Sequence, residues 1–111
     1  MQFTQWRRSA LSAVFIALVW GGGALGEIEA ARDLMEEGKF TEARTALWPA
    51  ARSGNAEAEE LIGVMYAMGL GVEQDYQRAF EWYLRSAMKG HPGAQSGVGW
   101  YYEVGLGMPA I

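Results

Sequence analysis

Apolar residues recur with the period of an α-helix in five segments of this chain. In residues 56–68, Ala58 is followed by Ile62, Met65 and Tyr66 at intervals of four, seven and eight positions, which places all four on one side of a helix. Similar stripes occur in four further segments: 27–37, 40–53, 75–89 and 93–104. The pattern predicts five amphipathic helices and an all-α fold.

Residues that begin and end helices stand at the borders of these segments. Asn55 and Asp75 each precede a stripe and are typical N-cap residues, because their side chains can accept hydrogen bonds from the first backbone N–H groups. Gly69, Gly71 and Gly90 follow stripes, and glycine readily adopts the left-handed conformation that ends a helix. We therefore predict short, tightly turned connections between the helices.

A block of about 22 residues occurs twice in the chain, at a shift of 36 positions. Eight positions are identical in the two copies: Ala51/Ala87, Gly54/Gly90, Ala58/Ala94, Gly63/Gly99, Tyr66/Tyr102, Gly69/Gly105, Leu70/Leu106 and Gly71/Gly107. Self-similarity at such a period is typical of stacked repeat architectures, which present surfaces to partners. The repeat predicts a degenerate unit over 27–54, a full unit over 55–90 and a half unit over 91–108, with each helix pair forming an antiparallel hairpin.

Two glycines stand in the middle of predicted helices at the repeat period. Gly63 and Gly99 each cost a helix about 1 kcal/mol relative to alanine. Because the cost recurs at equivalent positions, we interpret both glycines as points of close approach between neighbouring helices.

The stretch from Ala58 to Gly90 reads A-x-x-x-I-G-x-x-Y-x-x-G-x-G-V-x-x-D-x-x-x-A-x-x-W-Y-x-x-x-A-x-x-G and resembles one full Sel-one-like repeat, a tetratricopeptide-related α/α motif. The structural repeat positions that the resemblance covers are Ala58, Ile62, Gly63, Tyr66, Gly69, Gly71, Asp75, Ala79, Tyr83, Ala87, Gly90, Ala94, Gly99, Tyr102, Gly105 and Gly107. The resemblance implies a short right-handed α/α solenoid of about two and a half repeats, with a role in protein–protein interaction. Bacterial members of this kind are often exported adaptors.

The third repeat unit stops where its second helix would begin. Nothing after Gly107 matches Asp75, Ala79 or Tyr83, so the helix over 93–104 lacks a hairpin mate and Val98, Tyr101 and Tyr102 lose part of their cover. Two interpretations follow: the gene is truncated, or another polypeptide covers this end. Self-association through the incomplete repeat is one form of the second, because an exposed apolar patch is often an interaction site.

The first 26 residues have the pattern of a secretory signal peptide. Arg7 and Arg8 precede an uncharged apolar run and small residues, which suggests cleavage after Gly26. The protein is then exported, to the periplasm or outside the cell. The alternative is an inner-membrane anchor over residues 9–26, although the apolar run is short against the roughly 20 residues that span hydrocarbon. Contact with a membrane is expected only through an uncleaved leader.

Charge and composition argue against several classes of function. The formal net charge is −4 at pH 7, which argues against nucleic-acid binding because that binding depends on neutralising phosphates. The chain has no cysteine, which excludes disulfides, thiolate metal sites and thiol catalysis, and with them the activity of a cysteine-rich subgroup of the resembled family. No cofactor or metal ion is expected.

The sequence contains no clear set of catalytic residues. Glu57, Glu59 and Glu60 have the composition of an acid/base or metal cluster, but they fit better as the solvated first turn of a helix, near its positive end. The single histidine, His91, is expected in a solvated turn. We therefore expect no enzymatic activity; the alternatives are an envelope hydrolase that uses its carboxylates, such as Glu57 or Glu60, and a non-functional fragment of a longer repeat protein.

The binding surface is expected on the concave face, lined by the first helix of each unit. Its predicted positions are Arg32, Glu36, Glu57, Glu60, Val64, Met68, Trp100 and Glu103. Trp100 is the strongest candidate for a binding residue, because aromatic anchors dominate the energetics of interfaces. The alternative is that Trp100 is buried against the end of the chain. The sequence thus predicts a non-catalytic scaffold or adaptor that binds a protein or peptide on this face or at the uncapped C-terminal end.

Overall fold

The computed structural model describes residues 24–106. Within this range the chain forms helices and no β-strand, as the periodicity predicts. The helices are α2 (Ala24–Glu36), α3 (Phe40–Arg52), α4 (Ala56–Met68), α5 (Tyr76–Met88) and α6 (Pro92–Val104). The predicted leader lies outside the described residues apart from residues 24–26, which form the start of α2. Gly107, a predicted repeat position, also lies outside them.

Helices α4 and α5 begin at the N-cap residues that the sequence indicates, whereas α2 begins at Ala24, three residues before its predicted start. The side chain of Asn55 accepts a hydrogen bond from the N–H of Ala58 at 3.0 Å, and Asp75 accepts one from the N–H of Arg78 at 3.1 Å. Gly69 closes α4 in the left-handed conformation, with φ of +69°. These caps satisfy free N–H groups at the starts of α4 and α5, and the left-handed Gly69 ends α4 before the loop that leads back to α5.

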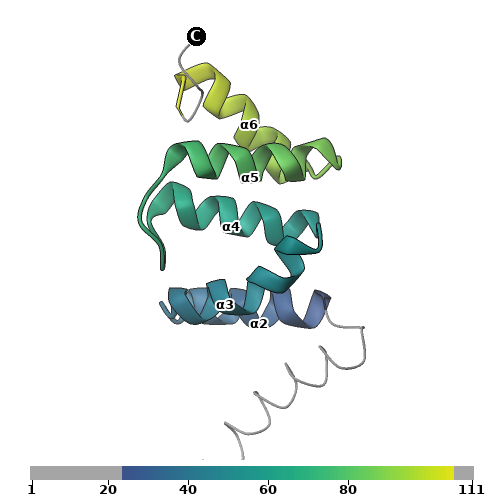
Figure 1. Ribbon diagram of the computed structural model, residues 1–111, viewed down its shortest axis with the longest axis vertical. Coiled ribbons are helices and arrows are strands. Elements are labelled where there is room, and N and C mark those ends of the chain that lie inside the picture. The colour runs from purple at the N-terminus through teal and green to yellow at the C-terminus, as the bar shows by residue number, and fades with distance from the viewer. Residues whose placement is uncertain (1–23, 107–111) are drawn as a thin grey trace, which may run out of the picture.

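The helices stack in chain order into a short right-handed α/α solenoid of about two and a half hairpins. Helices α2 and α3 form the lowest layer of Figure 1, α4 and α5 follow as an antiparallel pair, and α6 lies obliquely across the top. Each helix packs mainly on its neighbours along the chain, with the closest packing between α4 and α5. The described residues therefore form two complete hairpins and the first helix of a third.

Small buried residues at equivalent repeat positions form the centre of each helix contact. Ala43 and Ala79 occupy one such position, Ala58 and Ala94 another, and all four are fully buried. Larger side chains fill the space between the layers: Ile28, Leu47, Leu61, Ile62, Met65, Tyr66, Phe80 and Tyr101. Alanine at these points brings the helix backbones together, so the larger side chains pack into one continuous core.

Only one of the two mid-helix glycines marks a close approach. A methyl group on Gly63 would lie 3.3 Å from both the carbonyl oxygen of Ala79 and the ring of Tyr83, which confirms the prediction there. A methyl group on Gly99 would meet nothing within 4 Å, so the prediction is wrong for Gly99. The reason is that no helix follows α6 among the described residues. The tight contact of α6 is instead at Gly97, where an added methyl group would lie 3.3 Å from the ring of Tyr83.

The sequence predicts reduced cover for both Tyr101 and Tyr102, and the structure agrees only for Tyr102. Tyr101, expected to lack cover, is only 2% exposed because Phe80, Tyr83 and Tyr76 pack around its ring. Tyr102 is 58% exposed, whereas Tyr66 at the equivalent position is buried. The difference arises because the loop after α4 covers Tyr66, while the described residues hold no such loop over Tyr102.

None of the helices formed by residues 24–106 combines the length and the apolar character that crossing a membrane requires.

Candidate functional site

The predicted binding positions lie on three helices that hold equivalent places in the repeat. Arg32 and Glu36 are exposed on α2, and Trp100 and Glu103 are exposed on α6. On α4 the positions are half-buried except for Met68, which is exposed: Glu57, Glu60, Val64 and Met68. We call these eight residues the first-helix face.

Polar contacts join the three helices on this face. Arg32 of α2 donates a hydrogen bond to the carboxylate of Glu57 on α4 and forms an ion pair with it. Glu60 of α4 contacts the Nε2 atom of His91, just before α6, at 2.5 Å. The structure therefore brings Arg32, Glu57 and Glu60 together along one side, with their charges engaged between successive units.

Two expectations about the acidic first turn of α4 are wrong. Glu59 is not solvated: its side chain is only 3% exposed, and Lys89 donates a hydrogen bond to it at 2.6 Å. His91 is half-buried against Glu60 instead of standing free in a turn. Both contacts join residues about 30 positions apart, so the periodicity of a single helix could not indicate them.

Apolar side chains extend the first-helix face toward α6. Val64 and Met68 are one turn apart on α4, and Trp100 and Val104 stand at the equivalent positions of α6. Trp100 is 51% exposed, so it is not buried against the chain end. Its ring packs edge-on against buried Tyr101, with ring centroids 5.4 Å apart. Trp100 is thus an exposed aromatic side chain supported from below by the core.

The core beneath Trp100 perturbs the titration of two tyrosines. Burial raises the pKa of Tyr83 to about 12, with smaller effects from Tyr101 and Glu60. Burial, and then Tyr76, raise the pKa of Tyr101. These phenols stay neutral at physiological pH, which suits a packing role better than acid–base chemistry.

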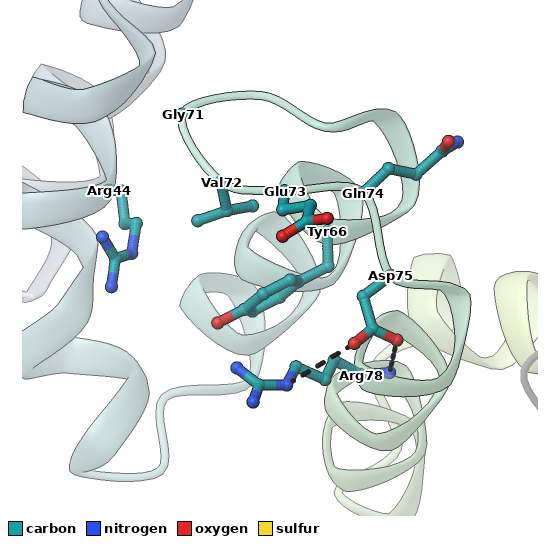
Figure 2. Close-up of a pocket in the computed structure, with 8 residues that line it drawn as sticks. All are labelled: Arg44, Tyr66, Gly71, Val72, Glu73, Gln74, Asp75 and Arg78. Atoms are coloured by element: carbon teal, nitrogen blue, oxygen red, sulfur yellow. Dashed lines mark hydrogen bonds and ion pairs between the residues drawn. The ribbon is translucent and has the colours of Figure 1, made fainter.

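A second feature, a cleft of about 470 Å³, lies on the side of the loop that joins α4 to α5 (Figure 2). Its lining residues come from α3, α4, the loop and α5: Arg44, Tyr66, Gly71, Val72, Glu73, Gln74, Asp75 and Arg78. The loop reaches down toward α3 on the left of Figure 1. Contact with Tyr66, and then the charge of Asp75, raise the pKa of Arg78.

Sequence reasoning missed this cleft, because it combines a helix of the first unit with the loop of the second. One signal could have indicated it. The shift of 36 positions pairs Arg44 with Phe80, which is buried and packs its ring against Tyr102. A charged residue at the position of a core aromatic is a departure from the repeat, and departures of this kind are where function can be sought.

The described residues offer little for metal binding. Within 24–106, no three His, Cys, Asp or Glu side chains gather in a group that could hold a metal ion. Of the acidic cluster at the start of α4, Glu57, Glu59 and Glu60 each contact a basic side chain. With its carboxylates paired in this way, the start of α4 suits contact with the surface of another protein better than metal binding.

Comparison with known proteins gives consistent matches. The family model described as "Sel1 repeat" matches residues 56–91 and 92–110. Two curated relatives from Arabidopsis thaliana, the ERAD-associated E3 ubiquitin-protein ligase components HRD3A and HRD3B, are 39% and 36% identical over 67 residues. These matches cover 60% of this chain but only 10% and 11% of the relatives. A crystal structure of a Sel1 repeat protein from Oxalobacter formigenes is 34% identical with a TM-score of 0.68, and the match covers 77% of this chain and 34% of that one.

Proposed function

Because this chain is a Sel1-like repeat protein, we propose that it is a non-catalytic module that binds another protein through the first-helix face, with Trp100 as the central anchor. Sel1 repeat proteins generally mediate protein–protein interaction, and the family is typically a non-catalytic scaffold. The observation that carries the proposal is the exposure of Trp100 on a rigid aromatic base. A half-exposed tryptophan that already packs on a neighbouring ring offers a large apolar surface to a partner, and tryptophan is enriched among interface hot spots.

The surroundings of Trp100 support the same proposal. Val104 and Glu103 flank it on α6, and Val64 and Met68 continue the apolar stripe on α4. The charged contacts Arg32–Glu57 and Glu60–His91 lie along the same face. An apolar centre with a polar surround is the usual anatomy of a non-obligate interface.

Photocrosslinking in cells tests this face directly. A benzoylphenylalanine residue is placed in the full chain at position 100, and matched variants carry it at exposed Thr45 of α3 and Gln77 of α5. We expect a discrete protein adduct from position 100 and none from positions 45 and 77. Equal adducts at all three positions, or none at position 100, would refute the proposed site.

A second copy of the chain is the other candidate partner, and the exposed end of α6 favours it. Tyr102 and Val104 are exposed there, and the ring of Tyr102 packs against that of Phe80, with ring centroids 5.6 Å apart. Sedimentation of the full chain over a range of concentrations separates the two candidates. A dimer that Tyr102→Ser weakens supports self-association, whereas a monomer at every concentration leaves a different protein as the partner.

We also propose that the protein is exported and acts in the periplasm or outside the cell. The support is the basic, then apolar, then small-residue order of residues 1–26. Mass spectrometry of the protein recovered from cell fractions tests this. A mature chain that starts at Glu27 in the periplasmic fraction supports export with cleavage, and an intact chain in the membrane fraction supports the anchored alternative.

A further inference from the structure

Backbone contacts with α3 and α4 fix the position of the loop that joins α4 to α5, and with it the shape of the cleft beside this loop. Gly71 has a φ of +68°, and a methyl group on it would lie 2.8 Å from the carbonyl carbon of Phe40. The loop backbone is therefore seated directly on the start of α3. Asp75 donates its N–H to the carbonyl of Tyr66 at 2.9 Å, and Gln74 donates its side-chain amide to the carbonyl of Ala67 at 2.9 Å. These contacts hold the loop at both ends.

Hydrogen-bond donors from three elements face the cleft. Figure 2 shows Arg44 on the α3 wall, with the guanidinium of Arg78 and the hydroxyl of Tyr66 directed toward the space in front of it. The Nε atom of Arg44 is buried, and none of the described residues accepts a hydrogen bond from it. A buried donor without an acceptor is costly, so it indicates a place where a ligand supplies the acceptor.

Two arginines and two acidic residues line the cleft, and among the described residues only Asp75 and Arg78 form an ion pair with each other. Asp75 is matched by Arg78, since its Oδ2 lies 3.6 Å from the Nε of that residue. Arg44 forms no ion pair with any residue of 24–106, and its guanidinium lies over the ring of Trp48. Glu73 also lines the cleft but is exposed to solvent. Because Arg44 is not engaged in an ion pair, it can meet one negative charge of a ligand, and the nearby carboxylate of Glu73 disfavours a doubly charged phosphate.

We propose that this cleft binds a single carboxylate of a polypeptide, held between Arg44 and Arg78 with the Tyr66 hydroxyl as a third donor. Planar guanidinium groups match the two oxygens of a carboxylate, and such hydrogen bonds are about twice as strong as neutral ones. The carboxylate comes either from an acidic side chain or from the C-terminus of the bound polypeptide. The site lies on α3, α4, the loop and α5 and shares no residue with the first-helix face, so each proposal can fail without the other.

Nuclear magnetic resonance of the full-length protein tests the proposal through the Nε–Hε signals of its arginines. The probes are three acetylated peptides: Ala-Ala-Glu-Ala-Ala with an amidated C-terminus, pentaalanine with a free C-terminal carboxylate, and the neutral amide Ala-Ala-Gln-Ala-Ala. We expect saturable shifts of the Arg44 and Arg78 signals with at least one charged peptide, and the peptide that binds identifies the source of the carboxylate. Saturation by the neutral peptide at the same concentration, or no saturation by either charged one, overturns the proposal.

Matched variants separate the site from general electrostatics. R44Q and R78Q are each expected to weaken the charged peptide about tenfold or more, since each removes a charge-assisted hydrogen bond. Thermal unfolding of each variant serves as the folding control, because Arg78 pairs with Asp75 and lies over the ring of Tyr66. R85Q removes the same charge from α5 outside the cleft, where Arg85 lies over Trp82, and is expected to bind normally.

E73Q is expected to bind more tightly because it removes a repelling charge. Equal loss in R85Q and R44Q, or weaker binding by E73Q, overturns the proposal.

Discussion

Replacing Gly63 and Gly99 by alanine is expected to change stability in opposite directions, although the repeat makes the two positions equivalent. In either helix the substitution gains about 1 kcal/mol of helix propensity. At Gly99 nothing lies within 4 Å of the new methyl group, so the gain is retained. At Gly63 the methyl group meets the carbonyl oxygen of Ala79 at 3.3 Å. Relief requires α4 to move away from α5, and overpacking of this kind costs about 1–3 kcal/mol.

The net expectation is a stabilisation of about 0.5–1 kcal/mol for Gly99→Ala and a loss of up to about 2 kcal/mol for Gly63→Ala. Urea titration followed by circular dichroism measures both, with equal slopes showing that the same surface is exposed on unfolding. Gly97→Ala provides an intermediate case, because the atoms nearest its methyl group belong to the side chain of Tyr83 and not to a helix backbone. A Gly63→Ala protein as stable as Gly99→Ala would refute the close approach of α4 and α5.

Three further predictions concern a buried charge, a loop and a phenol. Lys89→Ala is expected to cost about 2 kcal/mol in urea titration, because it leaves the buried carboxylate of Glu59 without the partner at 2.6 Å. Gly71→Ala is expected to cost about 3 kcal/mol in the same assay, because it adds left-handed strain to an overlap with the backbone of Phe40. The pKa of Tyr83 is raised to about 12 in the folded protein, against about 10 when unfolded, so its contribution to stability is complete below pH 10 and is lost as pH rises toward 12. Tyr83→Phe is expected to make that alkaline decline shallower in thermal unfolding at stepped pH.

Each of the first two predictions has a matched control in the same protein. Lys39→Ala removes a lysine from an exposed pair with Glu37 and is expected to cost less than about 0.5 kcal/mol. Gly90→Ala places alanine at a φ of +85° with nothing within 4 Å, so only the left-handed strain of about 1–2 kcal/mol remains. If Lys39→Ala costs as much as Lys89→Ala, burial of Glu59 is not the cause; if Gly90→Ala costs as much as Gly71→Ala, the contact with α3 is not the cause. For the phenol, an alkaline decline of equal steepness with and without the Tyr83 hydroxyl would contradict the raised pKa.

Much of the architecture could be predicted because it depends on neighbours within a turn or two. The stripe Ala58, Ile62, Met65 and Tyr66 repeats with the helical period, and it is buried as a set. The N-caps at Asn55 and Asp75 act through backbone groups three residues away. Positions of this kind carry their structural role in the local sequence, and the shift of 36 residues then predicts the stack.

What the sequence determined by itself is therefore the set of helices, their caps and their order along the solenoid. The tertiary structure alone decided which charges are engaged and where the surface is hollow. Glu59 meets Lys89, and Arg44 faces the loop of the following unit, across separations of about 30 residues. Such contacts depend on the distance and angle between stacked hairpins, and a one-dimensional period does not specify how side chains from different layers meet.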